Sequence, residues 1–315
     1  MTHTRHLIIG DGVIGRATAQ ALRTHGQDVC LASRTPAAND LPHLRLDALD
    51  GAALHAAASG ASHIHVTLGL PYRAAVWERD WPRIMQNAID AALAHGAGLV
   101  WFDSVYAYGP LPLQVPMRED HPLAPPSRKG RVRKHLLRML GAAGARQGLR
   151  WLVARSADFY GPGARLSLLY VAAIERQLQG RSAWWLANAD RPHSFTYTPD
   201  AGRAMALLAL AADTWQQSWH LPTASPAPTP RQLLAESARQ LSLPPRLQVL
   251  PLPSLRLFCP FDGLLREVLP MLYQNRQDYV FDSSKFMARF PDFRITPYAQ
   301  GLATMVEAFR TVTHR

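Results

Sequence analysis

Three glycines near the start of the chain have the spacing of a phosphate-binding turn. Gly10, Gly12 and Gly15 form a G-x-G-x-x-G pattern that follows an apolar run and precedes a helical pattern. In that context the first glycine permits a tight turn, the second lets the backbone approach a pyrophosphate, and the third lets helix and strand pack closely. Val13 and Ile14 would add N–H donors at the positive end of the helix dipole. The pattern therefore predicts that the chain binds a pyridine dinucleotide.

The end of the second predicted strand bears on the form of that cofactor. An Asp or Glu at this point accepts hydrogen bonds from the ribose hydroxyls of NAD, whereas an Arg suits the 2′-phosphate of NADP. The chain has Ser33 and Arg34 there, and no acid. Because arginine can bind a phosphate through two parallel hydrogen bonds, we predict NADP in preference to NAD. The alternative that Arg34 is a solvated loop charge stays open.

Two further segments are predicted to contact the cofactor. Asp47 follows a short third strand, where a carboxylate can accept from the exocyclic amine of an adenine. An equally good interpretation makes Asp47 the N-cap of a helix that starts near Gly51. Thr67, Leu68 and Gly69 end the fourth strand and are expected to lie close to the cofactor's ribose, where a small residue gives access.

These residues need a sheet that brings strand ends together. Apolar runs predict strands at 6–9, 29–32, 44–46, 64–68, 99–102 and 151–154, and helical patterns lie between them at 17–25, 51–59, 77–95 and 128–145. This alternation predicts the α/β fold class, with a Rossmann-type doubly wound parallel sheet and a smaller C-terminal substrate lobe. Ligands bind such a sheet at the carboxyl ends of its strands.

The domain organisation follows from where the pattern loosens. We predict a dinucleotide-binding domain over residues 1–160 and a substrate lobe over 161–315. Segments of that lobe at about 193–220 and 279–285 are expected to return to the main domain. Within it, the pattern predicts helices at 166–179 and 199–212 and a strand at 195–197.

Beyond the glycine turn, several stretches carry a family resemblance over nearly the whole length. They are Asp103–Gly109, Phe159–Gly163, Phe195–Asp200, Asp282–Lys285, Thr296–Pro297 and Gly301–Leu302. With these stretches the chain resembles an extended short-chain dehydrogenase/reductase, the NAD-dependent epimerase/dehydratase group. We also count Tyr160 among the expected cofactor contacts.

The resemblance implies a Ser, a Tyr and a Lys at the reaction centre. In the family the Ser and Tyr bracket a substrate oxygen, the Tyr exchanges its proton as hydride moves, and the Lys holds the nicotinamide ribose. Ser104 matches the Ser, five residues before Gly109. The Tyr and Lys positions fall on Lys129 and Arg133, so the chain is similar to an atypical member that lacks the usual Tyr and Lys.

The replacements suggest a different acid–base device. Lys129 and Arg133 are cations four residues apart on one helix, so they repel each other. Repulsion and burial would both favour the neutral amine of Lys129, which could then act as an acid or base and contact the cofactor. Arg133 could hydrogen-bond the ribose but would not titrate. Tyr106, two residues beyond Ser104, is an alternative phenol, and an interpretation in which it only packs in its loop stays open.

Two functions are consistent with these residues. The first is an NADP-dependent oxidoreductase or epimerase that acts on a carbonyl or alcohol of a small organic substrate. The second is a non-catalytic NADP-binding protein that senses redox state. Nucleic-acid binding is suggested only by the net charge of +11, and we expect no nucleic-acid partner. A homodimer through the predicted helices 77–95 and 128–145 is plausible by resemblance.

Composition excludes several other classes. No apolar run reaches the ~18–20 residues that span a bilayer, so we expect no membrane partner and a cytoplasmic protein. The only cysteines, Cys30 and Cys259, predict free thiols rather than a disulfide framework or a zinc site. The 13 histidines are scattered, and we predict no metal site.

Overall fold

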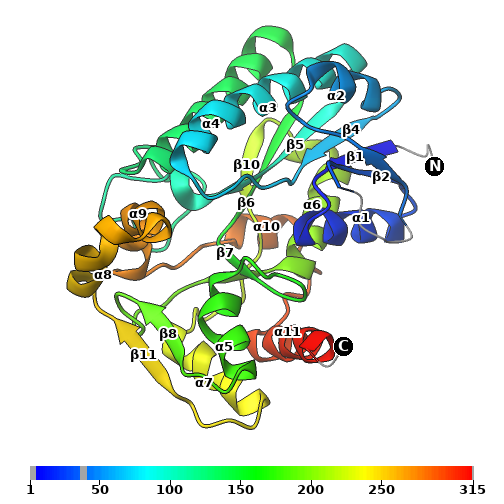
Figure 1. Ribbon diagram of the computed structural model, residues 1–315. Coiled ribbons are helices and arrows are strands. Elements are labelled where there is room, and N and C mark those ends of the chain that lie inside the picture. Colours follow the sequence, from blue (N-terminus) through cyan, green and yellow to red (C-terminus); the bar gives the residue numbers. More distant parts are fainter. Residues whose placement is uncertain (1–4, 36–40, 314–315) are drawn as a thin grey trace. The chain divides into compact units, whose positions relative to one another are not determined.

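A computed structural model describes residues 5–35 and 41–313 of the chain (Figure 1). The strands are β1 (Arg5–Ile9), β2 (Asp28–Ser33), β3 (His43–Arg45), β4 (His63–Val66), β5 (Gly98–Ser104), β6 (Trp151–Ser156), β7 (Asp158–Tyr160), β8 (Ala183–Leu186), β9 (Phe195–Tyr197), β10 (Gln217–His220) and β11 (Leu247–Leu250). The helices are α1 (Val13–Thr24), α2 (Gly51–Ala57), α3 (Ala74–His95), α4 (Arg128–Gln147), α5 (Glu175–Leu178), α6 (Thr198–Leu210), α7 (Pro230–Gln240), α8 (Leu252–Phe258), α9 (Gly263–Val268), α10 (Ser284–Arg289) and α11 (Tyr298–Thr313).

A seven-stranded sheet forms the frame of the first half of the chain. Its strand order is β10-β6-β5-β4-β1-β2-β3, and every neighbouring pair is parallel. The order reverses at β1, where β2 lies on one side and β4 on the other, as in a doubly wound sheet. The predicted fold class is therefore confirmed.

Helices cover both faces of this sheet (Figure 1). Leu7, Ile9 and Trp101 point from their strands into a core shared with α2, α3 and α4. Ile8 and Leu31 point to the opposite face, where they pack against α1 and against Ala206 of α6. Alternate residues of one strand therefore serve two different cores, as the two-residue period of a strand requires.

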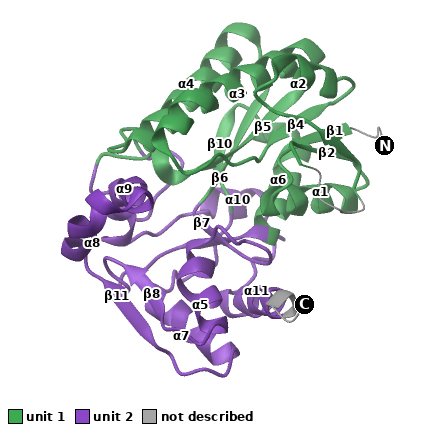
Figure 2. Ribbon diagram, in the orientation of Figure 1, with its two compact units in different colours: residues 1–110, 122–156, 199–221 green, residues 111–121, 157–198, 222–315 purple. Residues whose placement is uncertain are grey.

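The chain divides into two compact units (Figure 2). Unit 1 contains residues 1–110, 122–156 and 199–221, and unit 2 contains residues 111–121, 157–198 and 222–315. The sequence predicts a boundary at residue 160, whereas unit 1 leaves off at Ser156. It also predicts that about 193–220 and 279–285 return to the main domain; of these, 199–221 belongs to unit 1 and 279–285 to unit 2.

Unit 2 contains two small parallel sheets, β7–β9 and β8–β11. Its core gathers Tyr160, Trp185 and Phe195 with residues from α7 and α11. The segment 279–285 belongs to this unit because its backbone pairs there: Met117 donates to the carbonyl of Val280 at 2.8 Å, and Ser194 donates to that of Tyr279 at 2.8 Å.

Several elements differ from the sequence-based prediction. The predicted helix 166–179 is realised as a π-helical stretch, Tyr170–Ile174, followed by the short α5. The strands β7, β8, β10 and β11 were not predicted, because runs of three or four residues carry too few positions to show a period. Two helices also begin earlier than predicted: α1 begins at Val13 rather than at residue 17, and α3 at Ala74 rather than at residue 77. No helix among the described residues has the length and apolarity needed to cross a bilayer.

Candidate dinucleotide and active site

The glycine turn joins β1 to α1 and has the geometry that its sequence predicts. Gly10 has φ +121°, and a Cβ at this position would lie 2.5 Å from the backbone nitrogen of Leu68. Its N–H donates to the carbonyl of Ala32 at 2.8 Å, which ties the turn to β2. A Cβ at Gly15 would clash with the carbonyl oxygen of Gly10. Both glycines are therefore required by contacts with neighbouring backbone.

Gly12 differs from these two glycines, because a Cβ here would meet nothing within 4 Å. Gly12 is the N-cap of α1, and no side chain caps the helix. The first N–H groups of α1, from Val13 onward, thus lack an intrahelical acceptor and form the positive end of the helix dipole. The bare backbone and free helix end fit a pyrophosphate group. The carboxylate of Asp11 in the same turn pairs with Arg16 at 2.6 Å, which offsets its negative charge.

The end of β2 lies beside the same turn. The Ser33 hydroxyl donates to the carbonyl of Thr35 at 2.9 Å and lies 3.0 Å from Nε2 of His43. The same His43 nitrogen lies 3.8 Å from the carboxylate of Asp11. Arg34 is exposed. The sequence did not single out Asp11 or His43, whose contacts link the glycine turn to β2 and β3.

The other predicted cofactor residues of unit 1 are placed as follows. Asp47 is exposed and accepts from the N–H of Leu49 at 3.0 Å. The N-cap of α2 is Asp50, which accepts from Ala53, so the alternative of Asp47 as that cap is wrong. Thr67 is buried, and its hydroxyl is 3.2 Å from the carbonyl of Gly10, to which it donates.

Leu68 and Gly69 follow Thr67 along the loop that leaves β4. Leu68 is half-buried and Gly69 is exposed. A Cβ at Gly69 would meet nothing within 4 Å, so the backbone is open at this point. The loop after β4 and the glycine turn after β1 therefore lie side by side at the carboxyl edge of the sheet.

The predicted catalytic residues come from β5, from the 3₁₀ turn that follows it, Val105–Ala107, and from the first turns of α4. The hydroxyl of Ser104 is buried and has no hydrogen-bond partner among the described residues. Lys129 is 3% exposed, and its ammonium lies 4.1 Å from the ring centre of Tyr72. The Tyr72 hydroxyl in turn donates to the Tyr106 hydroxyl at 3.3 Å. The sequence did not single out Tyr72, whose only signal is its place soon after the loop that leaves β4.

Arg133 lies one turn further along α4, between aromatic rings. Its guanidinium carbon is 4.8 Å from the ring centre of Trp77 and 4.4 Å from that of Trp81, both on α3. Nη1 is 3.7 Å from the carboxylate of Asp103. Burial lowers the pKa of Arg133, and the negative charge of Asp103 opposes that shift. Arg133 therefore helps to hold α3 against α4, while its predicted contact with a nicotinamide ribose stays a prediction.

Asp103 is also the start of a buried polar network that the sequence did not reveal. Arg155 on β6 donates to the Asp103 carboxylate from Nη2 at 3.3 Å, and from Nη1 to the hydroxyl of Tyr108 at 2.6 Å. That hydroxyl lies 2.6 Å from Nε2 of His220 on β10. All four side chains are at most 2% exposed. The network links the neighbouring strands β5, β6 and β10, and its member Asp103 immediately precedes Ser104 on β5.

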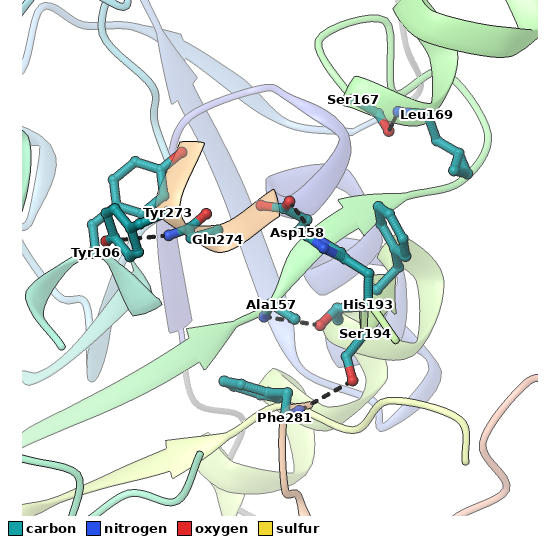
Figure 3. A network of polar contacts seen from close by, with 12 residues as sticks. Tyr106, Ala157, Asp158, Ser167, Leu169, His193, Ser194, Tyr273, Gln274 and Phe281 are labelled. Carbon is teal, nitrogen blue, oxygen red and sulfur yellow. Dashed lines mark hydrogen bonds and ion pairs between the residues drawn. The ribbon is translucent and has the colours of Figure 1, made fainter. Parts of the chain in front are cut away.

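Unit 2 holds a separate polar network (Figure 3). Nε2 of His193 lies 2.9 Å from the carboxylate of Asp158, and the His193 ring stacks on Tyr279 with centroids 4.3 Å apart. His193 is 2% exposed and lies among aromatic rings, which agrees with a structural role. Burial, with a smaller contribution from Asp158, raises the pKa of Tyr273 to about 12.

Tyr160 lies in the core of unit 2. It is 1% exposed, and its ring packs on those of Phe195, Tyr197 and Tyr298. Packing accounts for this burial, and the predicted contact of Tyr160 with the cofactor stays a prediction. Both cysteines are free thiols, as predicted. The described residues contain no group of three or more His, Cys, Asp or Glu side chains that could hold a metal ion.

The sequence model of the NAD dependent epimerase/dehydratase family matches residues 7–219. The chain belongs to this family. It is therefore an enzyme of the extended short-chain dehydrogenase/reductase type, and its family uses a nicotinamide dinucleotide. The matched span includes the glycine turn, Ser104 and the first turns of α4. No curated protein matches this epimerase/dehydratase family member by sequence.

Solved structures share the fold of this family member over nearly its whole length. UDP-glucose 4-epimerase from Thermotoga maritima, solved with UDP-glucose, is 17% identical with a TM-score of 0.79, covering 98% of this chain and 100% of the other. UDP-glucose 4-epimerase from Thermus thermophilus, in complex with NAD, is 20% identical with a TM-score of 0.75 and coverages of 98% and 99%. A dTDP-glucose 4,6-dehydratase from Streptomyces venezuelae, with NAD bound, is 20% identical with a TM-score of 0.79 and coverages of 98% and 97%.

Proposed function

We propose that this chain is an NADP-dependent oxidoreductase or epimerase that acts on a carbonyl or alcohol of a small organic substrate. The observation that carries the proposal is the pair of contrasting glycines in the turn after β1. Gly15 is demanded by the backbone of the turn, whereas Gly12 faces open space at an uncapped helix end. A contact within the protein explains the need for glycine at position 15, and the approach of a ligand explains it at position 12.

The residues at the end of β2 support the phosphate-bearing form of the cofactor. Ser33 stands where an acid would accept from the ribose of NAD, and Arg34 is exposed beside it. Arg34 would bind the 2′-phosphate, and Asp47 and the Thr67–Gly69 loop would contact the nucleoside parts. Two of the three structural neighbours named above are described with NAD, so the proposal of NADP is tested directly by the titration below.

The reaction residues of the proposal are Ser104, Tyr106, Lys129 and Arg133. The bound nicotinamide would supply or accept a hydride. The buried hydroxyl of Ser104 has a donor and two acceptor sites to offer a substrate oxygen. Lys129 stands at the family's Tyr position and brings a positive charge, while Arg133 keeps a fixed charge next to Asp103. The chain thus lacks the usual Tyr and Lys and retains the Ser.

We assign the dinucleotide site to unit 1, and we assign unit 2 as the substrate lobe. Two of the named neighbours are UDP-glucose epimerases and one is a dTDP-glucose dehydratase. Sugar nucleotides are therefore the first probes to test, and UDP-glucose and dTDP-glucose should be tested together with simple aldehydes and ketones.

The first test is a side-by-side titration of the purified protein with NADPH and NADH, read by nicotinamide fluorescence. We expect NADPH to bind more tightly than NADH. Arg34→Ala should weaken NADPH binding by about tenfold or more and so remove that preference. Arg23→Ala, an exposed arginine in the last turn of α1, is the matched control and should leave both affinities unchanged. Equal binding of the two forms contradicts the NADP assignment, and binding of neither contradicts the whole proposal.

A second candidate, a non-catalytic sensor of NADP redox state, has one observation in its favour. Both cations at the family's Tyr and Lys positions rest on aromatic rings, where they contribute to packing. A protein that binds NADPH tightly, but neither oxidises it with the carbonyl panel nor converts UDP-glucose or dTDP-glucose in the presence of NADP⁺, would support the sensor over the enzyme.

A further inference from the structure

Tyr72 lies in the loop between β4 and α3, and it joins Lys129 to Tyr106. The Lys129 ammonium is 4.1 Å from the centre of the Tyr72 ring, and the Tyr72 hydroxyl donates to the Tyr106 hydroxyl at 3.3 Å. The Tyr106 ring is stacked on Trp77 at 6.1 Å, and the Tyr72 ring meets Trp77 edge-on at 5.8 Å. Lys129 of α4 and Trp77 of α3 therefore pack against the rings of the two phenols.

The burial of these groups differs in a way that matters for proton transfer. Lys129 is buried, whereas Tyr72 and Tyr106 are both half-buried. A buried ammonium keeps its influence on nearby charge because water screens it poorly. The partly exposed phenols, in contrast, keep a route to solvent. The group thus has a protected charge at one end and an accessible hydroxyl pair at the other.

The phenol–phenol contact differs from the backbone contact that Tyr298 makes. Tyr298 in unit 2 fixes its hydroxyl on the backbone of Phe195, from which it accepts at 3.1 Å and to which it donates at 3.3 Å. Tyr72 instead bonds to another titratable side chain, and Tyr106 stands two residues after Ser104. A hydroxyl bonded to a hydroxyl can pass a proton, which a hydroxyl locked on a backbone carbonyl does not do.

We infer that Tyr72 and Tyr106 form the acid–base pair of this enzyme, in which Tyr106 exchanges the proton with the substrate oxygen and Tyr72 relays it to solvent. The inference rests on the proposed function and names its proton path. In the reducing direction the Tyr106 O–H bond breaks as its proton moves to the substrate oxygen. The Tyr72 proton then moves to the Tyr106 oxygen, and solvent reprotonates Tyr72. The two electrons are those of the hydride from the reduced nicotinamide dinucleotide.

In this arrangement Lys129 is a positioning residue and not the proton donor. Its ammonium stays next to the phenol that carries the transient negative charge, on the ring face of Tyr72. Lys129 thus occupies the family's Tyr position, and the two phenols, Tyr72 and Tyr106, come from two other segments of unit 1. Arg133 contacts the Trp77 ring and pairs with Asp103, and it is the second cation whose charge acts on Tyr106.

The test compares Tyr72→Phe, Tyr106→Phe and the double variant with the wild type. Each protein is assayed over a range of pH with NADPH against phenanthrenequinone and with NADP⁺ against UDP-glucose and dTDP-glucose, and NADPH affinity is measured separately by fluorescence. We expect Tyr106→Phe to lower kcat by about 100-fold and Tyr72→Phe by about tenfold, with KM and NADPH affinity unchanged. The double variant should be no slower than Tyr106→Phe alone, because the two hydroxyls act in one path.

Two further variants separate a relay from simple packing. Lys129→Met should lower kcat and move the pH profile of kcat to higher pH, whereas a packing role would change stability and leave the profile in place. Tyr170→Phe is the matched control, since the Tyr170 ring is also paired with a cation, Arg165, at 6.0 Å in unit 2, and it should behave as the wild type.

The outcomes distinguish this inference from the proposed function. A wild-type protein that turns over a probe while Tyr72→Phe keeps its full rate and pH profile overturns the relay and leaves the function standing. Additive losses in the double variant overturn the shared path. A wild-type protein that binds neither dinucleotide overturns the proposed function and the relay with it.

Discussion

Gly15 lies against the carbonyl oxygen of Gly10, so closely that a methyl group at position 15 would occupy the space of that oxygen. The contact closes the turn between β1 and α1. Gly12 lies between these two residues, and a Cβ added there would meet no atom within 4 Å. One glycine of the motif thus serves the fold, and its neighbour is left open to a ligand.

This contrast predicts opposite behaviour of two alanine variants. Gly15→Ala should lower the free energy of unfolding by about 1–3 kcal/mol, because the backbone of the turn must move to admit the methyl group. Gly12→Ala should fold with the stability of the wild type but bind NADPH at least about tenfold more weakly. Chemical denaturation and fluorescence titration check the two halves. Equal loss of stability in both variants would contradict the division of roles.

The sequence predicted the sheet because its period is clear where strands are buried and helices are long. The runs at β1, β2, β4, β5 and β6 alternate with amphipathic helices, and this pattern alone sets a parallel order. The strands that were missed, such as β7 and β10, have three or four residues. They are strands because a neighbouring strand supplies hydrogen bonds, and no local pattern reports that neighbour.

The site was predictable only where chemistry depends on residues close in sequence. The glycine turn is local, and its geometry is as expected. The partners of Lys129 and Arg133 come from a different element, since Tyr72 and Trp77 are more than 50 positions earlier in the chain. The pairing of Asp103 with Arg155 likewise depends on the register of β5 against β6, which places the two residues opposite each other.

Buried histidines on β1 and β4 predict loss of stability in acid. Burial lowers the pKa of His6 to about 4 and that of His63 to about 3, and His6 and Arg150 add to the shift at His63. The unfolded chain binds these protons near pH 6.5, so between pH 6.5 and 4 it holds more protons than the folded chain. The effect of these histidines on stability is therefore constant above about pH 6.5, and stability falls as the pH falls towards 4, by about 3 kcal/mol for His6 alone.

Denaturation at a series of pH values measures this loss. His6→Gln should reduce the slope of the curve between pH 6.5 and 4, whatever its effect at neutral pH, and the contribution of His63 should remain. His135→Gln, a change at an exposed position on α4, is the control and should leave the curve as it is. A wild-type stability that does not change over this interval would show that the buried rings accept protons without cost.

The buried carboxylate of Asp103 predicts a large structural effect next to the reaction centre. Asp103 faces Arg155 at 3.3 Å and Arg133 at 3.7 Å, and all three side chains are at least nine-tenths buried. Asp103→Ala leaves two buried cations without their carboxylate and should lower the free energy of unfolding by about 3–5 kcal/mol. Asp190→Ala removes a carboxylate from the exposed pair with Arg231 and should leave stability unchanged. Similar values for the two variants would contradict the role of burial.

Two phenols of unit 2 predict the behaviour of the protein in alkali. Burial raises the pKa of both Tyr273 and Tyr298 to about 12, and for Tyr273 the charge of Asp158 adds to the shift. In the unfolded chain the same phenols ionise near pH 10. Because the folded pKa is the higher one, the stability that these groups contribute is complete below about pH 10 and is lost as the pH rises towards 12.

Tyrosinate absorbance measures this directly. At about pH 11 the native protein should keep Tyr273 and Tyr298 protonated, and denaturant added at that pH should release both protons. Tyr298→Phe should reduce the denaturant-dependent step by one phenol. Ionisation of all nine phenols together near pH 10, with the protein still folded, would show that Tyr273 and Tyr298 reach solvent and that the core of unit 2 is open around them.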